Sequence, residues 1–278
     1  MILVVGANGM LGRDLLSLLG ERGRGVDLPE MDITDILSVQ RVLTALKPKV
    51  LVNCAAYTDV DGCESDTETA MQVNAEGVAF LAMISREIGA TLVQISTDYV
   101  FDGSKGSPYR EDDLPRPLNV YGESKLAAEL NVDVNPDNLL IRTQWLYGLH
   151  GKNFVETMLR LGREKSELSV VDDQIGAPTW TVDLARGILA LIDKGCRGTY
   201  HVANSGSTSW NGFAREIFAA AGMQVAVLPT TTEQLNRPAR RPLHSTLDCG
   251  KLLADTGLAL QPWQEALRQY LAIRPEEV

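Results

Sequence analysis

The chain has 278 residues, of which 45% are hydrophobic and 22% are charged, and its formal net charge is -10. This length and balance are typical of a globular protein of one α/β domain plus a smaller lobe, and they exclude a disordered or membrane-embedded chain. The negative charge argues against a nucleic-acid partner, because nucleic-acid-binding proteins present a basic face to phosphates.

The apolar start, Met1 to Val5, has no basic leader and runs directly into glycines. It therefore predicts a buried first strand rather than a signal peptide, and no apolar run is long enough to cross a bilayer. We expect a cytoplasmic protein with no membrane partner. The cysteines are widely spaced and the histidines are isolated, so we predict reduced thiols and no metal site.

Strand-like and helix-like segments alternate along the chain, which is typical of an α/β fold with a doubly wound parallel sheet, the Rossmann arrangement. Strands are predicted at 2–5, 50–52, 91–95 and 139–141, together with a short second strand that ends near 26–27. Helices are predicted at 10–19, from Thr34 or Asp35 to Pro48, at about 68–88 and from Tyr121 onward. After residue 150 the alternation loosens, with helices at 153–163 and 182–192 and extended segments at 168–171 and 199–202.

A glycine turn follows the first predicted strand, with Gly6, Gly9 and Gly12 spaced three residues apart. Such a turn lets the backbone approach a pyrophosphate and places a helix N-terminus against its negative charge. A tight turn without a ligand is the alternative, but the order of strand, turn and amphipathic helix favours a dinucleotide. We therefore expect residues 1–150 to form a dinucleotide-binding domain. Residues 151–278 would form mainly a smaller C-terminal substrate lobe, with some segments returning to complete the sheet.

Two charged residues bear on the choice of cofactor. Asp27 lies at the end of the second predicted strand, where a carboxylate accepts hydrogen bonds from the adenosine ribose, and this favours NADH. Arg13 follows the last glycine and is a candidate partner for a 2′-phosphate, so NADPH stays open. The predicted cofactor is NADPH or NADH.

Tyr121 and Lys125 lie four residues apart and share one helical face. A free tyrosine ionises near pH 10, so we expect the ammonium of Lys125 to lower the pKa of Tyr121 toward neutrality. Thr97 follows a predicted strand and would project from its carboxyl end, where open α/β sheets bind ligands. Together the three residues predict a carbonyl reductase in which Tyr121 supplies a proton.

Longer segments carry a family resemblance, namely Asn53–Asp61, Ser96–Gly103, Tyr121–Lys125, Gly151–Phe154 and Asp173–Thr179. With them the chain resembles the extended short-chain dehydrogenase/reductase superfamily and, within it, the dTDP-4-dehydrorhamnose reductase family. The resemblance covers nearly the whole chain. It implies hydride transfer from a reduced nicotinamide to C4 of dTDP-4-dehydro-L-rhamnose, and hence a nucleotide-sugar substrate.

The resemblance also implies roles for single residues. Thr97, Tyr121 and Lys125 match the catalytic positions. The cofactor positions it implies, besides Tyr121 and Lys125, are Gly6, Asn8, Gly9, Met10, Leu11, Gly12, Asp32, Ile33, Ala55, Ala56 and Tyr57. The sugar positions are Asp98, Trp145 and Asn153, in addition to Thr97 and Tyr121. The proline-bracketed cluster Arg237, Arg240 and Arg241 offers candidates for the substrate diphosphate, with Arg237 first.

Alternatives stay open at this point. A relative of the family is a nonenzymatic regulatory subunit, and a dinucleotide fold alone does not prove turnover. Nucleotide-sugar epimerases and dehydratases form a third class, although dehydratases generally have a glutamate where Tyr99 follows Asp98 here. Some relatives are magnesium-bridged dimers built on glutamates. Asp14 is a possible counterpart of one such residue, but the set is incomplete, so we predict no metal requirement and leave a homodimer open.

Overall fold

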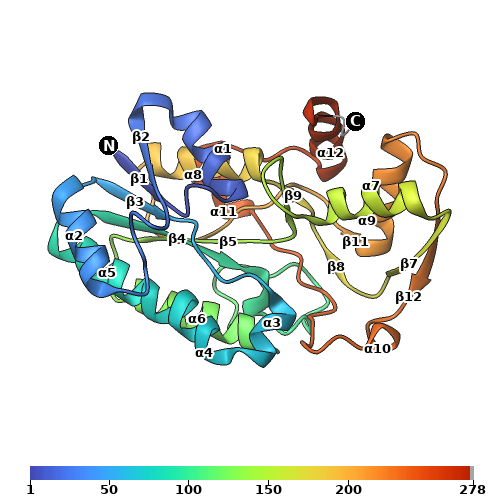
Figure 1. Cartoon of the computed structure of the whole chain (residues 1–278), viewed down its shortest axis with the longest axis horizontal. Coiled ribbons are helices and arrows are strands. Elements are labelled where there is room, and N and C mark those ends of the chain that lie inside the picture. Colours follow the sequence, from blue (N-terminus) through green and yellow to red (C-terminus); the bar gives the residue numbers. More distant parts are fainter. Residues whose placement is uncertain (276–278) are drawn as a thin grey trace.

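A six-stranded parallel sheet lies at the centre of the computed structural model, which describes residues 1–275 (Figure 1). Its strand order is β10-β5-β4-β3-β1-β2. The strands are β1 Ile2–Val5, β2 Gly23–Val26, β3 Val50–Asn53, β4 Thr91–Thr97, β5 Leu139–Thr143 and β10 Gly198–His201. The predicted doubly wound parallel sheet is therefore confirmed.

Helices cover both faces of the sheet, and this explains why its central strands β1 and β3 are short, almost wholly apolar runs. In β1, Ile2 and Val4 pack toward one layer while Leu3 and Val5 pack toward the other. The first layer contains α1 Met10–Leu19, α8 Thr181–Asp193 and α11 Gly250–Thr256, and the second contains α2 Ile36–Leu46, α5 Gly77–Glu87 and α6 Val120–Asp133 (Figure 1). The central strands β1, β3, β4 and β5 thus contribute to two hydrophobic cores, whereas the edge strands β2 and β10 each contribute to one.

The strand order reverses beside β1, which pairs with β2 on one side and with β3 on the other. In open parallel sheets, ligands bind in the crevice outside the carboxyl ends of the strands at such a reversal. The glycine turn leaves β1 here, and Cys54 to Tyr57 leave β3 beside it. The topology therefore brings two of the predicted cofactor segments together.

A second lobe has its own core, in which Phe213, Ile217 and Tyr270 are fully buried. Its helices are α7 Phe154–Glu164, α9 Trp210–Ala220, α10 Thr232–Leu235 and α12 Trp263–Ile273, and its paired strands are β7 Glu167–Val171 with β12 Ala226–Thr230, β6 Leu146–Tyr147 with β9 Thr179–Trp180, and β8 Ile175–Gly176 with β11 Thr208–Ser209. Within residues 1–275, no helix has both the length and the apolarity that crossing a bilayer requires.

The structure divides the region predicted as one helix at 68–88. Helix α4 Thr67–Met71 passes through a π-helical turn, Gln72–Glu76, into α5, and a further helix, α3 Val60–Ser65, precedes it. Asp59 and Asp66 start α3 and α4, because their carboxylates accept the N–H groups of Gly62 and Thr69. The π turn directs Asn74 at the loop after β3, where it bonds the backbone of Tyr57 in both directions at 2.8 and 2.9 Å.

Candidate active site

A cavity of about 890 Å³ opens at the carboxyl ends of β1, β3, β4 and β5. Its walls come from the glycine turn, the loop after β3, the end of β4, the start of α6 and the segment after β5. Of the residues predicted from the sequence, those that line it are Asn8, Gly9, Met10, Leu11, Gly12, Arg13, Ala55, Ala56, Thr97, Asp98, Tyr121, Lys125 and Trp145. The structure therefore brings the catalytic candidates and most of the cofactor candidates to one space.

The glycine turn has the backbone geometry that its sequence requires. Gly6 has a φ of 73°, and a Cβ there would lie 2.6 Å from the backbone nitrogen of Ala55. A Cβ on Gly12 would lie 2.3 Å from the carbonyl oxygen of Gly6. Gly9 differs, because its Cβ would meet only that same oxygen, at 3.4 Å, and would otherwise project into open space. The turn and the start of α1 are packed against each other, and only Gly9 leaves room for a ligand.

Thr97 is the last residue of β4, and its side chain is buried. Its hydroxyl accepts the N–H of Tyr99 at 3.1 Å and donates to Oδ1 of Asp98 at 3.1 Å. Tyr121 lies in the first turn of α6, which Asn119 caps by accepting the N–H of Gly122 at 2.7 Å. The strand end and the helix start thereby present the two hydroxyl groups to the same cavity.

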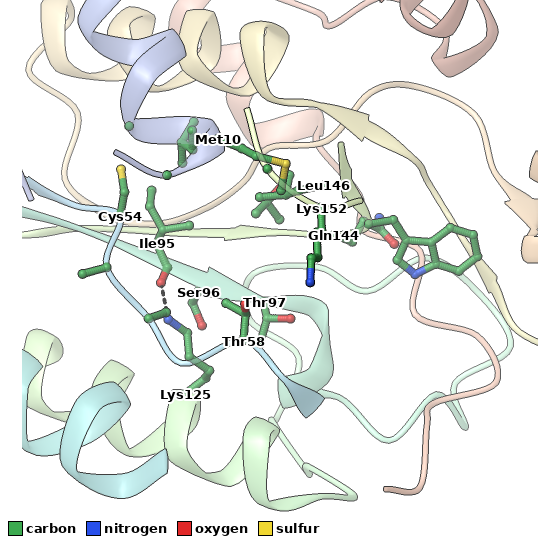
Figure 2. A pocket seen from close by; sticks show the side chains of 18 of the residues that line it. Met10, Cys54, Thr58, Ile95, Ser96, Thr97, Lys125, Gln144, Leu146 and Lys152 are labelled. Carbon is green, nitrogen blue, oxygen red and sulfur yellow. Dashed lines mark hydrogen bonds between the residues drawn. The ribbon is translucent and has the colours of Figure 1, made fainter. Parts of the chain in front are cut away.

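Lys125 is buried under this pair, and its Nζ donates to the carbonyl of Ile95 at 2.7 Å (Figure 2). Burial lowers the pKa of Lys125 to about 8, although Glu129 and Cys54 act in the opposite direction. Burial raises the pKa of Tyr121 above its usual value, and the nearby Asp98 adds to this rise, while Thr97 opposes it. The expectation that the pKa of Tyr121 falls toward neutrality is therefore wrong for this arrangement, because burial and Asp98 dominate and Nζ of Lys125 bonds the strand instead of the phenol.

Asp98 is a buried carboxyl group at the reacting end of the cavity. It accepts hydrogen bonds from the hydroxyls of Thr97 and Ser245. Burial raises its pKa to about 7, against the opposing effect of these two hydrogen bonds. Asp98 can therefore exist in either protonation state near neutrality.

Trp145 forms one wall of the cavity in an unusual backbone conformation, with a φ of 50°. Its indole stacks on that of Trp210 with ring centroids 3.7 Å apart and planes 10° from parallel. Gly176 lies against the same ring, where a Cβ would come within 2.5 Å of it. Trp210 also lines the cavity, but nothing in the local sequence had indicated it, because its partner lies 65 positions earlier in the chain.

Asp27 and Arg13 lie together in a neighbouring groove at the end of β2. Oδ2 of Asp27 accepts the N–H of Asn8 at 2.8 Å, and Nε of Arg13 donates to the carbonyl of Asn8 at 3.1 Å. The two candidates for recognition of the adenosine ribose therefore flank one backbone unit of the glycine turn. This placement is compatible with both NADH and NADPH.

Several predicted residues do not line the cavity or the groove. Gly6, at the start of the glycine turn, packs against the backbone of Ala55. The N–H of Tyr57 donates to Asn74, and Asp32 accepts the N–H and the hydroxyl of Thr34 at 2.9 and 2.7 Å. Ile33 is buried. These residues support the walls, and their contact with a cofactor stays a prediction.

Two predicted substrate residues have protein partners. Asn153 caps α7 by accepting the N–H of Glu156 at 3.1 Å, and its amide donates to the carbonyl of Gly148 at 2.8 Å. Arg237 donates to Asp61 at 3.1 Å, and Arg241 binds both oxygens of the same carboxylate. Neither Asn153 nor Arg237 reaches the cavity wall, so their substrate contacts also stay predictions.

No cluster of three or more His, Cys, Asp and Glu side chains within residues 1–275 is placed to hold a metal ion. Asp14, the possible counterpart of a magnesium-linked glutamate, is buried and accepts the hydroxyl of Thr181. Its carboxylate therefore faces the interior of the chain.

Comparison with known proteins matches residues 1–274 to the family described as RmlD substrate binding domain. A dTDP-4-dehydrorhamnose reductase of Streptomyces griseus is 47% identical over 278 residues, which cover 96% of this chain and 91% of that protein. A dTDP-4-keto-6-deoxy-D-glucose reductase of Streptomyces niveus is 41% identical and covers 96% of this chain and 95% of its own. The crystal structure of dTDP-4-dehydrorhamnose reductase from Bacillus anthracis in complex with NADP has a TM-score of 0.95 at 42% identity, with 98% of both chains covered.

Proposed function

The chain belongs to the RmlD substrate binding domain family, and from this premise we propose that it is an NAD(P)H-dependent oxidoreductase that reduces the C4 ketone of dTDP-4-dehydro-L-rhamnose to dTDP-L-rhamnose. The observation that carries the proposal is the convergence of Thr97, Tyr121 and Lys125 on a cavity that begins at the glycine turn. The reaction belongs to nucleotide-sugar biosynthesis.

The glycine turn fits the pyrophosphate of a nicotinamide dinucleotide. Gly9 has open space where a side chain would project, and it begins α1 without a side-chain cap. The first N–H groups of that helix thus have no capping side chain, as a bound phosphate requires. When bound, the reduced nicotinamide supplies the hydride. NADPH and NADH both fit this description, and Asp27 and Arg13 are the residues we assign to the choice between them.

The protein's own groups act on the ketone oxygen. Hydride arrival at the carbonyl carbon leaves negative charge on this oxygen, which the hydroxyl of Tyr121 can stabilise by hydrogen bonding. The hydroxyl of Thr97 can do the same once it donates to this oxygen instead of to Asp98. Tyr121 then delivers its proton to the oxygen. The raised pKa of Tyr121 keeps its hydroxyl protonated until that moment. Lys125, one turn further along α6, provides a positive charge that offsets the developing phenolate.

The remaining assignments follow this geometry. We assign residues 1–150 mainly to cofactor binding and residues 151–278 mainly to the substrate lobe, with β10 and α8 returning to the sheet. Asp98 and Trp145 are assigned to the sugar because both line the cavity that Thr97 lines, and Asp98 bonds the hydroxyl of Thr97. A nonenzymatic regulatory role would not require Thr97, Tyr121 and Lys125 to meet in a cavity, so catalysis is favoured.

One experiment tests the proposal directly. Purified protein is mixed with enzymatically generated dTDP-4-dehydro-L-rhamnose and either NADPH or NADH, and the loss of nicotinamide absorbance is followed. Rapid oxidation is the expected result. A parallel reaction contains dTDP-4-keto-6-deoxy-D-glucose, because the Streptomyces niveus relative is named for that ketone. Faster turnover of dTDP-4-keto-6-deoxy-D-glucose would make that ketone the substrate in place of dTDP-4-dehydro-L-rhamnose. No turnover of either ketone, despite cofactor binding, would support the regulatory role.

A further inference from the structure

Lys152 is a cation in the cavity to which the mechanism gives no role. It lies in the loop between β6 and α7, and its side chain is exposed. Figure 2 shows it extending across the cavity from the side opposite Thr97, with its ammonium group pointing into the open space. Within residues 1–275 it has no hydrogen-bond or ion-pair partner. The charge of this group is therefore free to meet a ligand.

The loop that holds Lys152 is anchored on both sides of it. Asn153 binds the carbonyl of Gly148 at 2.8 Å and caps α7, and the hydroxyl of Tyr270 donates to the same carbonyl at 3.3 Å. Gly151 has a φ of 112° and lies against the side chain of Met10. The predicted substrate residue Asn153 thus fixes the loop, and its neighbour Lys152 presents the charge to the cavity.

The charges around the cavity favour an anionic ligand there, although the chain as a whole carries a net charge of -10. Its lining contains Arg13, Lys125 and Lys152 but only one carboxyl group, Asp98. Nε of Arg13 bonds the carbonyl of Asn8, and Lys125 bonds the carbonyl of Ile95. Of these three cations, Lys152 is the one that has no partner in the described part of the chain.

The arginines predicted for the substrate diphosphate are placed elsewhere. Arg237 and Arg241 share the carboxylate of Asp61, which ties their segment to α3. Arg240 is exposed and does not line the cavity. The negative charge of the substrate therefore needs another partner within the cavity.

We propose that Lys152 forms an ion pair with the diphosphate of the nucleotide-sugar substrate. This inference rests on the proposed function. The dinucleotide cofactor also carries a diphosphate, but the glycine turn and the start of α1 already serve that group. Figure 2 shows the ammonium extending toward Thr97, on the side where the substrate reacts. Because its ion pair forms in a partly enclosed cavity, Lys152 would add affinity for the nucleotide without acting on the ketone.

The test measures binding without turnover. Calorimetry gives the affinity for dTDP, and nicotinamide fluorescence gives the affinity for NADPH, in the wild type, Lys152→Gln, Lys152→Arg and the control Lys194→Gln. Lys194 is an exposed lysine outside the cavity, so its replacement changes the net charge equally. We expect Lys152→Gln to weaken dTDP binding about tenfold at low salt, as one charge-assisted contact is lost. Lys152→Arg and Lys194→Gln should stay within about twofold, and all four proteins should bind NADPH equally.

The outcomes separate this inference from the proposed function. Unchanged dTDP affinity in Lys152→Gln overturns the role of Lys152 alone. Loss of NADPH affinity without loss of dTDP affinity also overturns it and assigns the lysine to the cofactor diphosphate. Equal losses for both ligands would indicate a general effect of the cavity's charge and would overturn the ion pair. A wild-type protein that binds no dTDP overturns both the ion pair and the proposed substrate.

Discussion

Asp98 shows how burial and hydrogen bonding set the state of a single residue. Its carboxyl group is buried beside Thr97, and its pKa is about 7, well above the usual value of 3.8. A raised pKa means that the folded protein holds this proton more tightly than the unfolded chain does. The proton is therefore present below about pH 7 and is lost as the pH rises through that value.

The pH dependence of the reaction should report this titration. As Asp98 ionises above about pH 7, its negative charge opposes the charge that develops on the ketone oxygen, so kcat should fall. Asp98→Asn should flatten this part of the profile and leave a fall near pH 8, where Lys125 loses its proton. Initial rates at saturating substrate between pH 5 and pH 9 test the prediction. An unchanged profile in Asp98→Asn would assign the titration to another group.

Tyr121 is the proposed proton donor, and its replacement separates binding from chemistry. Tyr121→Phe removes only the hydroxyl, so we expect kcat to fall roughly 10³-fold, within the range for loss of a general acid. NADPH affinity should change little, because the glycine turn is intact. Single-turnover rates and nicotinamide fluorescence provide the two measurements. Wild-type turnover in this variant would remove Tyr121 from the mechanism.

At the scale of elements, the glycine turn and the start of α1 pack as one unit, in which Gly12 and Gly9 differ in how well they accept a side chain. A Cβ on Gly12 would lie 2.3 Å from a backbone oxygen, so Gly12→Ala should cost roughly 2 kcal/mol or more of unfolding free energy. Gly9→Ala should stay within about 0.5 kcal/mol of the wild type and yet weaken NADPH binding, because its methyl group would project into the cavity. Urea unfolding and NADPH titration of both variants test this contrast. Equal stability of the two variants would contradict it.

Helix α6 holds the end of β4 through residues one turn apart. Lys125 bonds the carbonyl of Ile95, and Glu129 accepts the hydroxyl of Ser96 at 2.6 Å, directly before Thr97. Glu129 also pairs with Arg142 of β5 at 2.7 Å, and both side chains are buried. Thr97, which we propose to be catalytic, is thus positioned by a network of hydrogen bonds and an ion pair between α6, β4 and β5.

Breaking this network should be costly. Glu129→Gln leaves the guanidinium of Arg142 buried without its counter-charge, and we expect a loss of about 3 kcal/mol in unfolding free energy. Arg160→Gln is the matched control, since it breaks an exposed pair with Glu164 and should cost less than about 0.5 kcal/mol. Denaturant titrations measure both changes. Equal small losses would show that the buried pair has little net value.

At the scale of the whole molecule, the cavity is formed by two parts of the chain. Trp145 follows β5 of the central sheet, and Trp210 begins α9 of the second lobe, yet their rings stack directly. The wall that Trp145 forms therefore depends on the packing of the second lobe against the sheet. A substitution at this contact would therefore change the wall of the cavity without touching Thr97, Tyr121 or Lys125.

The whole protein should be active without a divalent cation. The proposed steps use hydroxyl groups and an ammonium group, and the carboxylate of Asp14 is engaged by Thr181. We expect millimolar EDTA to leave both the rate and the sedimentation behaviour unchanged. Activity that EDTA abolishes and magnesium restores would contradict this prediction and would place a metal in the active assembly.

The sequence alone predicted the first strand, the first helix and the order along the chain of the glycine turn, Thr97, Tyr121 and Lys125. The strand at Ile2–Val5 and the helix at Met10–Leu19 followed from short apolar patterns and from the glycines between them, and the structure confirms both. These signals are local, because the period of burial and the conformational freedom of glycine act over a few residues. The family resemblance then supplied the substrate, which no local pattern encodes.

Only the tertiary structure decided which side chains face the cavity. It paired Arg237 with Asp61, placed Asn153 in a helix cap and turned Lys125 toward Ile95. It also left Lys152 without a partner among the residues that the structure describes. Each outcome depends on a partner or a space supplied by another segment; Arg237 and Asp61, for example, lie 176 positions apart. Such contacts form after the elements pack, so residue type and spacing within one element do not encode them.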